Sequence, residues 1–175
     1  MELTGEAYLF NLSLLAITFA AVSVLVMLMR QTMGGKLSNF DIHLITSYVA
    51  RGFAVAIAAV LPPLAADFGF PPAVFWAVTS GTAAVIFAAD MIHTQLQRDK
   101  ITGGGLPRFL VFAFSLQWLA SVLLAANAVI PQVQGMALYK GALTLSLAIV
   151  FWAFVRRIAS LLGQRPSEDW DPKRG

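Results

Sequence analysis

The chain has 175 residues, of which 58% are hydrophobic and only 12% charged, and its mean hydropathy is +0.75. These values lie outside the range of soluble globular proteins and predict one compact membrane domain, with no room for a second. The net charge of +3 is explained by basic residues at a membrane surface, so a nucleic-acid partner is not expected. The absence of cysteine excludes disulfides, thiolate metal sites and cysteine nucleophiles.

Five apolar segments are each long enough to cross a hydrocarbon core of about 30 Å. The predicted fold class is therefore an all-α membrane protein, a bundle of five transmembrane helices. The predicted spans are 7–29, 41–61, 73–94, 109–130 and 136–155. They form a single domain over residues 1–163, followed by a polar tail over 164–175. The second span is expected to begin at an N-cap of Ser38 and Asp41 and to end at Pro62–Pro63.

The distribution of basic residues predicts the orientation of the spans. All Lys and Arg residues except Arg51 and Lys140 lie in the turn 30–36, in the loop 98–108 or after residue 155. These three segments share one side of the membrane if five spans alternate. The positive-inside rule then places the N-terminus outside and the C-terminus in the cytoplasm, with the protein in the plasma (inner) membrane. The first span carries acidic residues where a signal peptide would be basic, so we expect it to stay attached.

Small and aromatic residues predict how the spans pack. Ala16 and Ala20 form a small-residue row at four-residue spacing, which lets another helix approach closely. Tyr8, Trp76 and Tyr139 are expected to mark the outer interface, and Trp152 the inner one, as an aromatic belt.

Arg51 stands in the middle of the second span. A charge at the bilayer centre costs about 2.5–3.5 kcal/mol on insertion scales, so the fold has to supply a partner or water. Other polar side chains lie on the same half of this helix; they are Asp41, His43, Ser47 and Tyr48. The third span carries a similar polar stripe that includes Asp90 and His93.

The geometry of two antiparallel helices predicts that Arg51 and Asp90 share a site. Asp90 lies about 12 Å nearer the cytoplasm than Arg51 if each span is centred in the bilayer. Each side chain leans towards the start of its own helix, so the two lean towards each other. A water molecule or Tyr48 could bridge the remaining gap. Gln117, near the midplane on the fourth span, could offer Arg51 a neutral acceptor.

Two further groups of polar residues are candidates for sites. His43, Asp90 and His93 could form a two-histidine, one-carboxylate metal site, and a haem held by the two histidines is a second cofactor hypothesis. An outer polar layer, at similar depths near the external face, consists of Asn11, Asn127 and Lys140. Hydrogen bonding between helices explains this layer without any ligand, and Lys140 can reach the interface unaided.

The sequence supports three functional interpretations. The first is an oligomeric protein that conducts or transports an ion or small solute along a hydrated path lined by Ser47, Tyr48, Arg51 and Asp90, since ionisable residues inside membranes often mark such paths. The second is an accessory or scaffold subunit of a larger membrane complex, in which the ion pair fixes helix register. The third is a metal-dependent membrane enzyme. The expected partners are the lipid bilayer and either copies of the chain or other subunits of the complex, and enzymatic activity is the less favoured outcome.

Overall fold

The described part of the protein consists of helices joined by short turns. The computed structural model describes residues 5–32, 39–102 and 108–163, without the side chains of 40, 41, 101, 102 and 159–163. The helices are α1 (Glu6–Thr32), α2 (Asn39–Ala66), α3 (Pro72–Thr102), α4 (Arg108–Val129) and α5 (Met136–Gly163). All five are long and apolar enough to cross a membrane, which confirms the predicted all-helical class. Ser38 and the tail over 164–175 lie outside the described residues.

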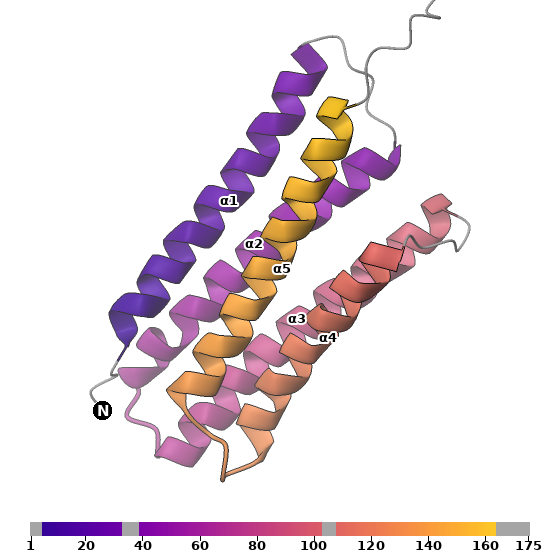
Figure 1. Cartoon of the computed structure of the whole chain (residues 1–175). Coiled ribbons are helices and arrows are strands. Elements are labelled where there is room, and N and C mark those ends of the chain that lie inside the picture. Colours follow the sequence, from indigo (N-terminus) through magenta and orange to yellow (C-terminus); the bar gives the residue numbers. More distant parts are fainter. Residues whose placement is uncertain (1–4, 33–38, 103–107, 164–175) are drawn as a thin grey trace, which may run out of the picture.

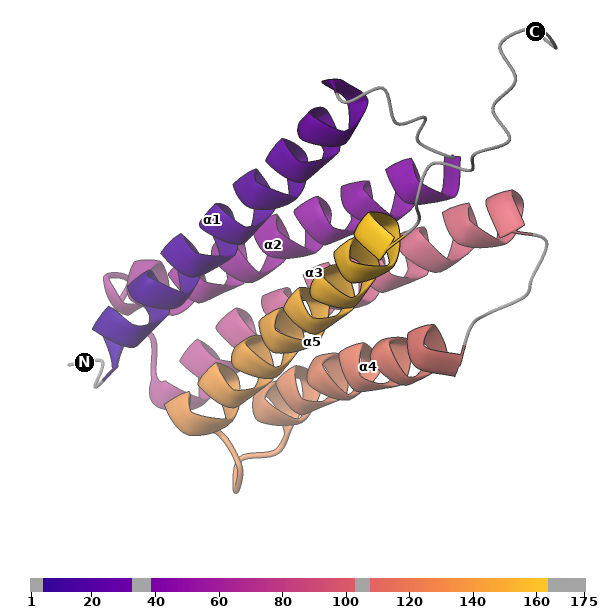
Figure 2. The same cartoon turned by 45° about the horizontal axis from the view of Figure 1, so that its top comes forward.

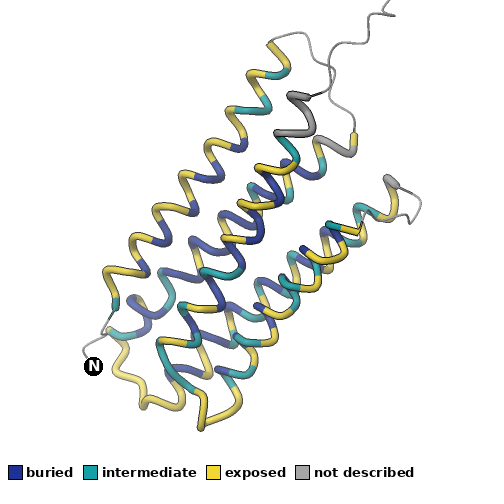
Figure 3. The backbone as a smooth tube through the Cα atoms, viewed as in Figure 1, coloured by how far each residue is buried: buried dark blue, intermediate teal, exposed yellow. Residues whose placement is uncertain are grey.

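Successive helices run in opposite directions, so the bundle has two distinct ends (Figure 1). We call the end where α1, α3 and α5 begin the Glu6 end, and the opposite end, where they finish, the Arg30 end. Helix α2 is in the middle: it packs against α1, α3 and α5, while α4 packs against α3 and α5 (Figure 2). In their most apolar parts, 56% of the residues of α2 and 50% of those of α5 are buried, against 33% in α1, α3 and α4 (Figure 3). The core of the bundle therefore lies around α2 and α5.

Helix α1 contacts α2 closely through small residues. Ala16 and Ala20 are both buried on the face of α1 that meets Gly52 of α2. A Cβ atom at Gly52 would lie 3.0 Å from the Ala16 carbonyl oxygen and 3.1 Å from the Ala20 Cβ. The small-residue row predicted on the first span is thus the contact surface, and the glycine on α2 is what allows the helices to approach.

The end of α2 differs from the prediction. The helix continues through Pro62 and Pro63 to Ala66, so the expectation that it ends at the two prolines was wrong. Pro62 has no N–H group, which leaves the carbonyl of Ala58 without its donor in the helix. The hydroxyl of Tyr139, on α5, donates to this oxygen at 2.6 Å. A neighbouring helix therefore supplies the hydrogen bond that the proline removes, as is common for proline in membrane helices.

The aromatic belt was predicted incorrectly for two of its four residues. Tyr139 is fully buried and Trp76 is 6% exposed, and their ring centroids lie 6.0 Å apart inside the bundle. The other two proposed belt residues, Tyr8 and Trp152, are exposed. Tyr139 was assigned to the interface because it lies near the start of its helix. Its hydroxyl instead donates a hydrogen bond inside the protein, so it does not require water or lipid headgroups as partners.

The bond between Tyr139 and Ala58 yields a stability prediction. Tyr139→Phe should lower the free energy of unfolding by about 1–3 kcal/mol, because it leaves a buried carbonyl without a donor. In a Pro62→Ala background the same substitution should cost less, since residue 62 regains an N–H for Ala58. Chemical unfolding in detergent micelles measures both values.

The control for this cycle is Tyr8→Phe, which removes a hydrogen bond from an exposed tyrosine to Thr144 and should cost less than Tyr139→Phe. Equal losses for Tyr139→Phe in the two backgrounds would show that the hydroxyl does not replace the missing helix donor.

Candidate functional site

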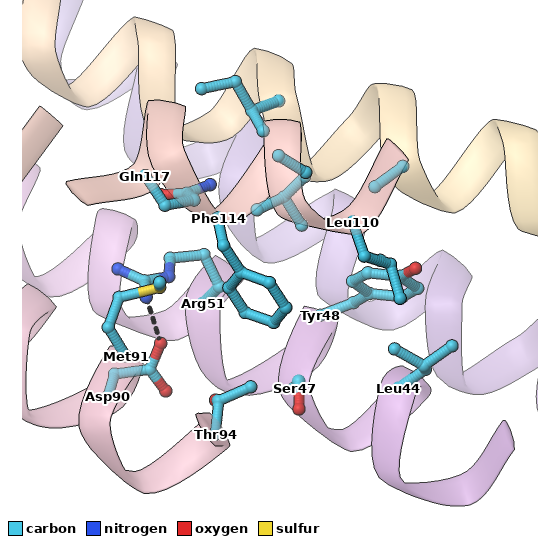
Figure 4. A pocket seen from close by; sticks show the side chains of 14 residues that line it. Leu44, Ser47, Tyr48, Arg51, Asp90, Met91, Thr94, Leu110, Phe114 and Gln117 are labelled. Carbon is cyan, nitrogen blue, oxygen red and sulfur yellow. Dashed lines mark ion pairs between the residues drawn. The ribbon is translucent and has the colours of Figure 1, made fainter. Parts of the chain in front are cut away.

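Arg51 and Asp90 form a buried ion pair between α2 and α3. Arg51 Nη2 lies 2.6 Å from Asp90 Oδ2, and the two side chains are 4% and 16% exposed (Figure 4). The contact is direct, although the two positions were expected to differ in depth by about 12 Å. The offset is smaller because α2 continues to Ala66: counted from the turn between α2 and α3, Arg51 is 15 residues from Ala66 and Asp90 is 18 residues from Pro72, a difference of about 4.5 Å. The bridge through Tyr48 that the sequence suggested is not needed.

Phe87 is a third member of this site. The Arg51 guanidinium lies over its ring, with Cζ 5.0 Å from the ring centroid, and Phe87 is fully buried. A cation over a desolvated aromatic face is stabilised by the negative potential of the ring. Sequence analysis did not identify Phe87. The available signal was its position three residues before Asp90, on the same face of α3.

A cavity of about 60 Å³ adjoins the ion pair. It is bounded by α2, α3, α4 and α5, and Figure 4 shows the side chains that surround it. The polar lining residues are Ser47, Tyr48, Arg51, Asp90, Thr94 and Gln117. All five residues predicted for the buried polar site therefore meet around one cavity. The remaining wall is apolar and includes Leu44, Met91 and Leu110.

Two buried polar atoms beside this cavity lack a hydrogen-bond partner among the described residues. They are Nη1 of Arg51 and the hydroxyl of Tyr48. Buried donors in proteins are nearly always paired with protein or water, because an unpaired one costs about 1–3 kcal/mol. A water molecule needs roughly 10–15 Å³ and two to four polar partners. The cavity has the volume for a few water molecules, but most of its surface is apolar, so Arg51 Nη1 and the Tyr48 hydroxyl are the groups that water would pair with.

Gln117 does not serve as the acceptor for Arg51 that was expected. Its amide is committed to α5 by two bonds: Nε2 donates to the Ser146 carbonyl oxygen at 2.9 Å, and Oε1 accepts from the Ser146 hydroxyl at 2.7 Å. Gln117 therefore contributes a wall of the cavity and joins α4 to α5. The Arg51 charge is balanced by Asp90 alone among the described carboxylates.

Neither histidine lines the cavity beside the ion pair. His43 is half-buried on α2 and His93 is exposed on α3. Where side chains are described, no group of three or more His, Cys, Asp or Glu residues lies close enough to hold a metal ion. His43, Asp90 and His93 are thus not brought together as ligands, and the metal and haem hypotheses gain no support. The side chain of Asp41 lies outside the described residues.

The outer polar residues do not form a single cluster. Asn127 is fully buried; its amide nitrogen donates to the Ser80 hydroxyl at 2.7 Å, and its oxygen accepts from the Gly135 N–H at 2.8 Å. It therefore ties α4 to α3 and to the turn before α5. Asn11 is exposed on α1, and Lys140 on α5 lies over the ring of Tyr8.

Comparisons with protein-family models, with curated proteins and with solved structures find no match. The function is therefore argued from the geometry of this site.

The ion pair yields a prediction of energetic coupling. Arg51→Ala and Asp90→Ala should each destabilise the protein by about 3–5 kcal/mol, since each leaves a buried charge without its partner. The double variant should cost less than the sum of the two. Unfolding in detergent measures this cycle.

A comparison pair is Arg98 and Asp99 on α3, whose charged atoms lie 2.5 Å apart and whose carboxylate side chain is 56% exposed. Exposed ion pairs contribute about 0–1 kcal/mol, so this second cycle should show weak coupling. Strict additivity for the Arg51 and Asp90 variants would mean that the buried contact contributes nothing.

Proposed function

We propose that this is a multi-pass protein of the plasma (inner) membrane that conducts or transports an ion or small solute past Arg51 and Asp90. In the proposed orientation the Glu6 end faces the exterior and the Arg30 end faces the cytoplasm, following the distribution of basic residues. The working form is an oligomer of this chain.

The observation that carries the proposal is the position of the cavity relative to the ion pair. Leu44 and Ser47 precede Arg51 on α2, and Thr94 follows Asp90 on α3, so this part of the lining lies towards the Arg30 end. Leu44 is seven residues from Arg51, or about 10 Å along the helix. The cavity would thus act as an inner vestibule that leads from the cytoplasmic side to the buried charges.

The other half of the bundle is closed by small and apolar side chains. Val55, Ala58 and Ala83 are fully buried, and Ala54 is 5% exposed. A solute that reaches Arg51 from the vestibule therefore meets a packed barrier. Transport requires this barrier to open, and the closed state seals the external side.

The ion pair sets the condition that a transported species has to meet. Within the closed bundle Arg51 and Asp90 neutralise each other, so neither sign of charge is favoured at long range. An anion has to replace Asp90 beside Arg51, and a cation or proton has to replace Arg51 beside Asp90. Partner exchange of this kind gives selectivity, because a species that cannot form the new contact leaves a buried charge unpaired.

A second candidate function is an accessory or scaffold subunit of a larger membrane complex. It is favoured by the near-complete burial of Arg51, which is 3% exposed, and by the direct 2.6 Å contact. A dry pair of this kind fixes the register of α2 against α3 without any transport. The two candidates differ in whether water reaches the pair.

The proposed orientation gives a first test. Reporter fusions after Gly163 and at Asp67 should report opposite sides of the membrane, with Gly163 in the cytoplasm. An enzyme reporter that is active only outside the cytoplasm, paired with one that is active only inside, makes the measurement. Two fusions on the same side would contradict the alternating spans.

The proposed vestibule gives a second test. A cysteine in place of Ser47, which lines the cavity, should react with a membrane-impermeant thiol reagent added from the cytoplasmic side. A cysteine in place of Ala50 is the control, since Ala50 is exposed on the outside of α2 and would face lipid. The chain has no native cysteine, so the background is clean.

Flux through reconstituted liposomes completes this test. Wild-type protein should carry one of a panel of protons, potassium and chloride above the rate of empty vesicles, and Asp90→Asn should lower that rate at least tenfold. A folded Ser47→Cys protein that stays unlabelled, together with no flux of any panel member, would reject the transport proposal in favour of the accessory-subunit function.

A further inference from the structure

A second hollow lies on the surface of the bundle, between α1 and α5. It is a groove of about 500 Å³, far larger than the cavity beside Arg51. Its walls are largely apolar, and several of the lining side chains face outward: Leu15 is 58% exposed, Val22 43% and Phe151 55%. The groove is therefore open to whatever surrounds the protein.

Two polar side chains towards the Glu6 end of this groove make no hydrogen bond or ion pair with the residues that the structure describes. Asn11 lines the groove and is exposed, and within the described part of the chain its amide makes no hydrogen bond. An unsatisfied amide inside a bilayer is costly, so a ligand that offers an acceptor would be stabilised there.

Lys140 is the second of these side chains. Its ammonium lies 5.3 Å from the ring centroid of Tyr8, a residue that itself lines the groove. Among the described residues no carboxylate pairs with it. The groove thus has a positive charge beyond one end, an amide just inside that end, and hydrocarbon along the rest.

The part of the groove beyond Asn11 matches one leaflet of a membrane. The lining on α1 runs from Tyr8 to Val22, 14 residues or about 21 Å, and from Asn11 onward it covers 11 residues or about 16 Å, close to half of a hydrocarbon core of about 30 Å. A transmembrane helix from a partner would need a track across both leaflets. A lipid chain needs only one.

We propose that the groove binds one anionic phospholipid, with its phosphate at Lys140, its ester oxygens at Asn11 and an acyl chain along Leu15 and Phe151. The order of charge, amide and hydrocarbon along the groove is the order of the same groups in such a lipid. This inference rests on the membrane insertion and orientation proposed above, and it is independent of conduction past Arg51.

Native mass spectrometry from detergent micelles tests the proposal with palmitoyl-oleoyl phosphatidylglycerol and the corresponding phosphatidylcholine as probes. Wild-type protein should retain one phosphatidylglycerol in preference to phosphatidylcholine. Lys140→Gln should reduce that preference about fivefold, the value of one lysine near an anionic lipid surface. Ala148→Trp, which fills the groove from α5, should lower retention of both lipids.

The matched control is Lys100→Gln, which makes the same change in charge at the Arg30 end and should leave lipid retention unchanged. Equal preferences in Lys140→Gln and wild-type protein would overturn the proposal, even if Ala148→Trp proves too disruptive to purify. Loss of a dimer on Ala148→Trp, without loss of lipid, would instead identify the groove as an interface between copies and also overturn it.

The result can be separated from the test of transport. If only the lipid proposal fails, Lys140→Gln and wild type bind lipid alike while Ser47→Cys is still labelled. If only transport fails, the phosphatidylglycerol preference persists while Ser47→Cys stays unreactive and no flux is seen.

Discussion

The charge of Arg51 is the constraint on which the rest of the bundle depends. A guanidinium in the middle of an apolar helix cannot face lipid without a large cost, so α2 has to be enclosed by other helices. Its enclosure by α1, α3 and α5 follows from this requirement. Helix α3 supplies both the carboxylate of Asp90 and the ring of Phe87, and the two contacts fix the rotation of α3 about its own axis. The ion pair thus fixes how α2 and α3 pack, and this role does not depend on the proposed transport.

Hydrogen bonds between helices also stabilise the bundle away from Arg51. In lipid, apolar surfaces gain little by associating, so helix association depends more on close packing and on hydrogen bonds between helices. The reciprocal bonds between Gln117 and Ser146 join α4 to α5, and Asn127 joins α4 to α3. Tyr139 joins α5 to α2, because its hydroxyl replaces the N–H donor that Pro62 lacks. Each of these residues is buried and hydrogen-bonded, whereas Arg51 Nη1 and the Tyr48 hydroxyl beside the cavity have no hydrogen-bond partner among the described residues.

The sequence was most informative about the partner of Arg51, because few residues of opposite charge lie in the predicted spans. The contact between Arg51 and Asp90 could be predicted because the predicted spans contain only two carboxylates, and the other one, Asp41, lies ten residues from Arg51 on the same helix. Helix ends and aromatic positions were less predictable. Proline usually ends a helix, and only the tertiary contact from Tyr139 lets α2 continue. Phe87 was missed because one phenylalanine among many apolar residues looks like core until its cation partner is placed.

The groove and the cavity lie on opposite sides of one layer of aromatic rings. Phe19 and Phe154 line the groove, and their ring centroids lie 5.2 Å apart. Phe154 also contacts the ring of Tyr48, at 5.8 Å, and Tyr48 lines the cavity beside Arg51. A well-packed interior transmits a displacement of one ring to the next, because there is little free volume to absorb it. A lipid chain bound in the groove as proposed would contact the same rings that bound the cavity, and Phe154 would connect it to the ion-pair site.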